Sequence, residues 1–340
     1  CTIVRISKGN SMVRKLSIRL ALREAMRQEM ENDETVFIMG EDVGVYQGVN
    51  QVTGNLIYEF GPERVMDTPI SETAFLGTAV GSAMLGLKPV VELQVADFIS
   101  VCLDPLLNQA AKIRFMSGNQ INVPMVLRAA FGAGLGAAAQ HSQSLEAFFC
   151  HIPGIKVVMP ATAYDAKGLL ISAIRDSDPI VFLEPRALYT DESEVPIKPY
   201  TIPLGKADLK REGKDISIIT YGSMLPVCLE LSLILEKKYN IDCEVIDLRS
   251  LQPLDTDTIL NSVAKTKRVI IVHEAVRFAG FGAEIAAQIS QTDLIYELKS
   301  PIRRVGAKFT PIPFAKHLEE STLPQLKSLL AEILAMFELT

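Results

Sequence analysis

The chain lacks several features that would assign it quickly to a functional class. It has no tryptophan and no stripe of basic residues, so nucleic acid is not expected as a partner. Its uncharged, largely apolar run at residues 73–87 is shorter than the ~20 residues that cross a bilayer. No contact with a membrane is therefore predicted.

Cysteines and catalytic signatures are also scarce. The five cysteines are scattered and form no Cys-x-x-Cys pair, which favours reduced thiols in the cytoplasm and argues against a zinc site. There is no G-x-x-x-x-G-K-[ST] loop, no His-Glu-x-x-His motif and no G-x-S-x-G elbow. A Gly-Asp-Gly motif followed by an asparagine-containing stretch, which would hold a magnesium diphosphate, is missing too.

What the sequence does contain is enough apolar material for two cores. It has 340 residues, 48% of them hydrophobic, and short apolar runs alternate with amphipathic stretches. This alternation predicts two α/β domains with mainly parallel sheets. We expect an expression tag or upstream extension over residues 1–11, a first domain over 12–190, a proline-rich linker over 191–212 and a second domain over 213–340.

The segment around Glu72 is the most informative one. Thr68-Pro69 predicts a turn, and Ser71 is a good N-cap for the helix that follows. Small residues keep that helix thin, which predicts a fully buried helix in close contact with its neighbours. A carboxyl at its start is partly desolvated and is suited to share a proton with a heteroaromatic ring nitrogen. Alternatively, Glu72 only complements the helix dipole.

A second informative segment combines a glycine-rich loop with a histidine. Residues 132–137 fit the G-x-G-x-x-A dinucleotide fingerprint, but no acid ends the next strand to hold a ribose. His141 follows, flanked by small and amide residues. It is suited to exchange protons in a cleft, or it is an ordinary loop histidine bonded to backbone.

Several ordered motifs together resemble the β subunit of thiamine-diphosphate-dependent 2-oxo acid dehydrogenases, a transketolase-like family that includes pyruvate, branched-chain 2-oxo acid and acetoin dehydrogenases. The resemblance runs through nearly the whole chain from Met12. The motifs are residues 67–72, 114–118, 140–146, 153–158, 165–169, 245–249 and 273–275.

This resemblance implies an enzyme that converts a 2-oxo acid and a lipoyl carrier to an acyl-lipoyl carrier and carbon dioxide. The first domain would bind the aminopyrimidine of thiamine diphosphate, and the second would contact the lipoyl-bearing acyltransferase core. An α subunit would complete an α2β2 heterotetramer and hold Mg²⁺ and the diphosphate, in the cytoplasm or, in a eukaryote, the mitochondrial matrix. The alternatives are an acetoin dehydrogenase β subunit and a non-catalytic docking subunit.

The resemblance also assigns roles to individual residues. Glu72 matches the glutamate that activates the cofactor through its pyrimidine ring, while Gln94 and Phe98 match residues of the pyrimidine pocket. His141 matches a histidine that hydrogen-bonds the reacting group and transfers a proton during acyl transfer. Pro105 departs from the glutamine usual in the family, at the first turn of a subunit-interface helix.

A structural potassium ion is a further implication of the resemblance. In this family the ion is held through main-chain carbonyls. The matching positions are Met125, Ala173, Asp176 and Asp178.

Overall fold

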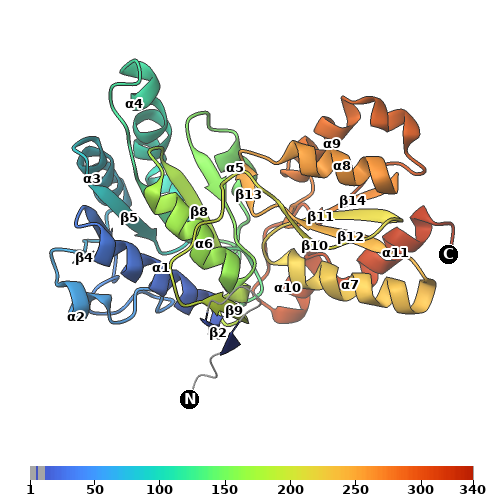
Figure 1. Cartoon of the computed structure of the whole chain (residues 1–340), viewed down its shortest axis with the longest axis horizontal. Coiled ribbons are helices and arrows are strands. Elements are labelled where there is room, and N and C mark those ends of the chain that lie inside the picture. The colour runs from blue at the N-terminus through green and yellow to red at the C-terminus, as the bar shows by residue number, and fades with distance from the viewer. Residues whose placement is uncertain (1–4, 7–11, 340) are drawn as a thin grey trace. The chain divides into compact units, whose positions relative to one another are not determined.

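The computed structural model describes residues 5–6 and 12–339, which fold into two compact units. The first contains the residues up to Phe131 together with Phe148–Leu204. The second contains Gly132–Ala147 and the chain from Gly205 onward. Both units are built on mostly parallel sheets with helices, so the predicted α/β class is confirmed (Figure 1).

The main sheet of the first unit has the order β7-β8-β6-β5-β3-β4, and its neighbouring strands are parallel. Nearly every residue of its central strands is buried, as the short apolar runs predict for strands covered on both faces. The strands are β3 (Val36–Gly40), β4 (Val65–Asp67), β5 (Lys88–Leu93), β6 (Val126–Phe131), β7 (Lys156–Val158) and β8 (Ile180–Pro185).

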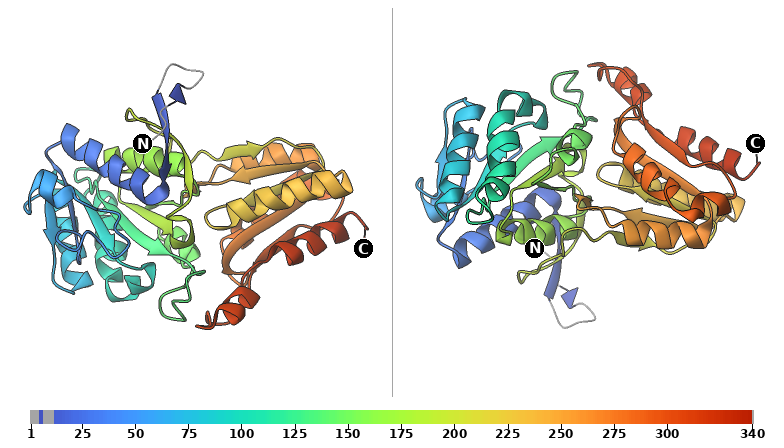
Figure 2. Two further views of the ribbon diagram at one scale, coloured as in Figure 1. Left: turned by 90° about the horizontal axis from the view of Figure 1, so that it is seen from below. Right: turned by 90° about the horizontal axis from the view of Figure 1, so that it is seen from above.

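Helices cover both faces of this sheet (Figure 2). The amphipathic α1 (Ile18–Asn32) packs with α6 (Ala163–Arg175) on one face. On the other face, α3 (Glu72–Met84) packs against the π-helical segment η2 (Pro105–Ala110), which continues into α4 (Ala111–Met116). The remaining elements are α2 (Leu56–Phe60), η1 (Ala96–Val101), α5 (Glu146–Cys150) and η3 (Arg186–Leu188).

A small antiparallel sheet uses part of the expected linker. Strand β9 (Glu192–Pro196) pairs with β2 (Met12–Ser17), which also pairs with β1 (Arg5–Ile6). The predicted linker 191–212 thus contains β9 and, in the second unit, β10 (Asp208–Arg211). Of the expected extension 1–11, all but residues 5–6 lies outside the described residues.

The sheet of the second unit has the order β10-β12-β11-β14-β15, with β10 antiparallel at one edge. Helices α7 (Met224–Tyr239) and α11 (Leu326–Met336) lie on one face, and α8 (Thr256–Thr266) and α9 (Gly282–Ser290) lie on the other (Figure 1). The other elements are β11 (Ile216–Thr220), β12 (Cys243–Asp247), β13 (Ser250–Gln252), β14 (Val269–Val276), η4 (Asp293–Glu297), β15 (Arg303–Ala307) and α10 (Lys316–Thr322).

Helix α3 differs from the prediction of full burial. It buries Phe75, Leu76 and Val80 but exposes a face of small residues that includes Gly77 and Gly81. The apolar content of this segment indicates burial, but glycines and alanines add little apolar surface when they are exposed. Ser71 occupies the N-cap position, but its side chain makes no capping hydrogen bond.

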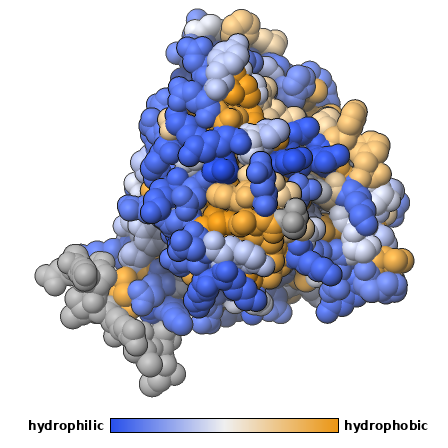
Figure 3. Space-filling view, turned by 90° about the vertical axis from the view of Figure 1, so that its right-hand side faces the viewer, coloured by the Kyte–Doolittle hydropathy of each residue, from blue (hydrophilic) through white to orange (hydrophobic). Residues whose placement is uncertain are grey.

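The surface carries both polar and apolar areas. On the face in Figure 3, hydrophilic side chains predominate and hydrophobic ones gather in patches between them. Exposed aromatic side chains of the second unit include Phe278, Tyr296, Phe309 and Phe314. Among residues 5–6 and 12–339, no helix is both long enough and apolar enough to cross a bilayer.

Candidate functional site

Three polar side chains gather where the parallel strands of the first unit end. Strands β3 and β5 are neighbours, and the residues that follow them are Glu41 and Gln94. Glu72 stands half-buried at the first position of α3. Gln94 hydrogen-bonds the Glu41 carboxylate, and the charge of Glu72 acts on the same group. The carboxyl edge of a parallel sheet is where such folds bind ligands.

The carboxyl of Glu41 lies in an environment that favours its protonated form. Burial raises the pKa of Glu41, and the negative charges of Asp42 and Glu72 raise it further. Nearby negative charges disfavour the ionised form of a carboxyl. This edge of the sheet therefore combines the carboxyl of Glu72 with a second acid, Glu41, whose pKa is raised.

Phe98 belongs to the same region. It lies in η1, and the Cys102 thiol is 3.9 Å from its carbonyl oxygen. Burial, and after it the charge of Glu72, raises the pKa of Cys102 to about 12. The structure thus brings the predicted residues Glu72, Gln94 and Phe98 into one region and adds Glu41, which we did not predict. The available signal was an acid directly after a buried strand.

His141 lies in a different part of the fold. It is half-buried in the loop 132–147, which belongs to the second unit. The neighbours of His141 in this loop, residues 139–140 and 142–145, line a cavity of about 490 Å³; residues 274–276, 307 and 309–312 line it as well. The glycine-rich part of the loop leads into irregular backbone rather than a helix N-terminus. A dinucleotide fingerprint needs that helix to bind a pyrophosphate, so the geometry does not support this alternative.

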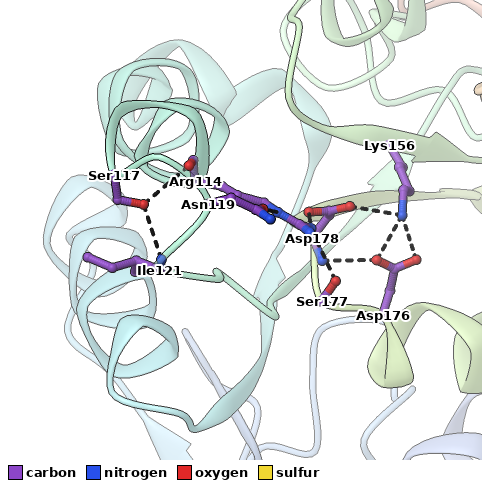
Figure 4. A network of polar contacts seen from close by, with 8 residues as sticks. All are labelled: Arg114, Ser117, Asn119, Ile121, Lys156, Asp176, Ser177 and Asp178. Carbon is purple, nitrogen blue, oxygen red and sulfur yellow. Dashed lines mark hydrogen bonds and ion pairs between the residues drawn. The ribbon is translucent and has the colours of Figure 1, made fainter.

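The two aspartates of the predicted potassium site are bound to basic side chains (Figure 4). The Lys156 ammonium lies 2.7 and 2.8 Å from the Asp176 oxygens and 3.1 Å from an oxygen of Asp178. Arg114 pairs with Asp178 from the other side. The positive charge beside these carboxylates is therefore already supplied by the protein.

The main-chain oxygens at the other two positions also have partners. Met125 precedes β6, and its carbonyl accepts the Ile180 N–H at 2.9 Å. The Ala173 carbonyl, in the last turn of α6, accepts the Asp176 N–H at 3.3 Å. Within the part of the chain that the structure describes, no three His, Cys, Asp or Glu side chains gather as a metal site.

The residues of the first unit fit an aminopyrimidine. Such a ring offers a basic nitrogen, an amino group and a flat face. Glu72 and Glu41 offer carboxyl groups, Gln94 an amide, and Phe98 an aromatic ring.

Comparisons with known proteins define the class. Residues 14–192 match the pyrimidine-binding domain of transketolase, and residues 205–329 match its C-terminal domain. A solved structure titled "Split gene transketolase, inactive beta4 tetramer" shares the fold with a TM-score of 0.77, although it is only 21% identical; the match covers 95% of this chain and 99% of that one. The chain is thus a two-domain, transketolase-like protein.

Relatives at higher identity define the family. The β subunit of acetoin:2,6-dichlorophenolindophenol oxidoreductase from Cupriavidus necator is 46% identical, with 94% of this chain and 97% of that protein covered. The β subunit of the pyruvate dehydrogenase E1 component from Rickettsia felis is 47% identical, with 91% and 94% covered. The β subunit of 2-oxoisovalerate dehydrogenase from Bacillus subtilis is 44% identical, with 88% and 92% covered.

The chain therefore belongs to the E1 β-subunit family of thiamine-diphosphate-dependent 2-oxo acid and acetoin dehydrogenases, and the family assignment made from the sequence motifs is confirmed.

Proposed function

We propose that the chain is the β subunit of the decarboxylating component of a 2-oxo acid dehydrogenase complex. With thiamine diphosphate, this component converts a 2-oxo acid and a lipoyl carrier to an acyl-lipoyl carrier and carbon dioxide. The observation that carries the proposal is the group formed by Glu72, Glu41 and Gln94 at the carboxyl edge of a domain that matches pyrimidine-binding domains.

Glu72 is the proposed activating acid. Its carboxyl shares a proton with the pyrimidine ring nitrogen opposite the amino group. The charge of Glu72 acts on the neighbouring Glu41. Gln94 and Phe98 orient the ring. The bound cofactor supplies the carbanion chemistry at its thiazolium carbon, and the protein holds it in place.

His141 is the proposed proton donor during acyl transfer to the lipoyl group. An imidazole is suited to this step because its ordinary pKa lies near neutral pH. An α subunit, in an α2β2 assembly, would hold Mg²⁺ and the diphosphate, since this sequence has no motif for them. We also propose contact with the acyltransferase core, potassium binding through the main-chain carbonyls of Met125, Ala173, Asp176 and Asp178, and a cytoplasmic or mitochondrial-matrix location.

Acetoin dehydrogenase is the second candidate function. It is supported by the 46% identity to the Cupriavidus necator subunit, a value close to those for the pyruvate and 2-oxoisovalerate relatives. A non-catalytic docking subunit is disfavoured, because such a protein would need neither Glu72 nor His141. Steady-state rates of the chain reconstituted with its α subunit on pyruvate, 2-oxoisovalerate and acetoin separate these functions.

Glu72→Gln tests the role of the acid. The amide cannot share a proton as the carboxyl does, so turnover of the reconstituted complex should fall at least a hundred-fold. Assembly with the α subunit, measured by size-exclusion chromatography, should not change. Glu63→Gln is the matched control, since Glu63 is an exposed acid in the same unit. Full activity in the Glu72 variant would rule out the proposed mechanism.

A further inference from the structure

The loop 132–147 is fastened by two buried carboxylates of the second unit. Glu274, in β14, is 7% exposed, and Glu319, in α10, is 2% exposed. A buried charge requires hydrogen-bonding partners, and here the loop supplies many of them.

Glu274 ties together the two ends of the loop. One of its oxygens, Oε1, accepts the Ala133 N–H at 2.8 Å and the Ser144 hydroxyl at 2.9 Å. The other oxygen accepts the hydroxyl of Ser223, at the start of α7. The carboxylate is thus fixed by the scaffold and closes the loop at its base. His141 lies inside the segment that is closed in this way.

Glu319 holds the glycine-rich part of the same loop. Its carboxylate accepts the N–H of Gly134 at 2.9 Å and that of Gly136 at 3.1 Å. Both glycines have positive φ, +100° and +67°, a conformation that lets amides two residues apart point toward one anion. The glycine pattern that resembles a phosphate-binding fingerprint therefore binds a carboxylate of the protein itself.

These hydrogen bonds are important because a cavity, rather than a packed core, borders the loop. The cavity of about 490 Å³ is lined by residues 139–140 and 142–145, on both sides of His141 in the sequence. A loop with empty space beside it can move when its anchors are removed, since few apolar contacts oppose the movement. The position of His141 thus depends on polar anchors.

We propose that Glu274 and Glu319 are positioning residues that hold the loop 132–147 in the conformation that presents His141 for acyl transfer. The inference rests on the role of His141 in the proposed function. A displacement of about 1 Å at a proton-transferring group is enough to slow a reaction roughly a hundred-fold. Neither carboxylate needs to touch the substrate for this effect.

The first test measures the loop directly, by hydrogen exchange of the full-length chain. Glu319→Gln leaves one acceptor oxygen where the carboxylate serves two amides, so exchange in peptides covering 132–147 should accelerate about ten-fold or more. Glu320→Gln is the control, because this neighbouring acid is exposed and does not contact the loop. Unchanged exchange in the Glu319 variant would overturn the proposal.

The second test measures function in the complex with the α subunit. In the Glu319→Gln variant, the kcat of acyl transfer to a lipoyl domain should fall ten- to a hundred-fold, with little change in the KM for the 2-oxo acid. Reduction of 2,6-dichlorophenolindophenol, which bypasses the lipoyl group, should change much less. Adding Glu319→Gln to His141→Ala should produce no further loss, since both variants remove the same contribution. Additive losses would contradict a positioning role.

A second variant and a comparison of the two tests separate failure of this inference from failure of the proposed function. If Glu319→Gln does not fold, Ser144→Ala removes only one hydroxyl from Glu274 and should still accelerate exchange in the loop. Faster exchange with an unchanged rate of acyl transfer would show that the anchors do not position His141. An inactive wild-type complex would refute the proposed function, whereas the exchange experiment would still report on the anchors.

Discussion

The buried acid Glu146 should make the stability of the protein depend on pH. Its side chain is completely buried, and one oxygen accepts the Tyr221 hydroxyl at 2.9 Å. The other oxygen has no hydrogen-bond partner among the described residues. Burial is the main reason that the pKa of Glu146 is raised from 4.5 to about 7. A hydrogen bond from its own backbone N–H and the one from Tyr221 oppose the increase, and the charge of Glu274 adds to it.

The sign and size of the effect follow from proton linkage. Between pH 4.5 and 7 the folded protein keeps the proton on Glu146, whereas the unfolded chain releases it. Stability therefore falls as the pH rises through this window. Each pKa unit corresponds to 1.36 kcal/mol, so the free energy of unfolding should drop by roughly 3 kcal/mol because of this group. Outside the window its contribution is constant.

Glu146→Gln isolates the contribution. The amide can still accept the Tyr221 hydroxyl but does not titrate, so the variant should gain about 3 kcal/mol relative to wild type between pH 4.5 and 7. Urea unfolding of the full chain, followed by tyrosine fluorescence because there is no tryptophan, measures this difference at each pH. Glu230→Gln, at an exposed position of α7, is the control. A difference that does not change with pH would refute the reasoning.

Two further predictions concern the first unit. The Arg128 side chain is 1% exposed and pairs with Glu92 at 2.9 Å and with Glu184 at 2.7 Å. Arg128→Met leaves these two buried carboxylates without their partner, so the free energy of unfolding measured in urea should fall by about 3–5 kcal/mol. A decrease below ~1 kcal/mol would contradict this prediction. Gly154 has φ +102°, and an added Cβ would lie 1.9 Å from a backbone oxygen of α4. Gly61 also has a positive φ, +80°, but no atom lies within 4 Å of a Cβ added there. Gly154→Ala should therefore lower the thermal midpoint more than Gly61→Ala does. Equal decreases in the midpoint would show that only the backbone angle matters.

Much of the architecture could be predicted from hydrophobic periodicity. The stripe formed by Leu22, Met26 and Met30 predicts α1, and the short run Val36–Met39 predicts β3. These signals are local, because the residues that form one face of a helix or the interior of a strand are close in sequence. The parallel arrangement followed from their alternation along the chain.

The candidate site could be predicted only in part. Glu72, Gln94 and Phe98 were found by resemblance to a family, while Glu41 was not, although all four lie in one unit. The prediction that α3 is fully buried failed for a related reason: the sequence shows that Gly77 and Gly81 are small but not which surface faces them. Both the place of Glu41 in the site and the exposed face of α3 depend on contacts between distant segments of the chain.

The glycine-rich loop shows why local patterns are ambiguous. Three glycines at alternate positions allow backbone amides to converge on an anion, and this property is the same for a phosphate and for a carboxylate. What decides between them here is Glu319, which is 185 positions from Gly134 in the sequence. The carboxylate of Glu319 accepts the amides that would otherwise be available to a phosphate. A motif of this kind therefore predicts that an anion is bound, and only the fold shows whether that anion comes from outside.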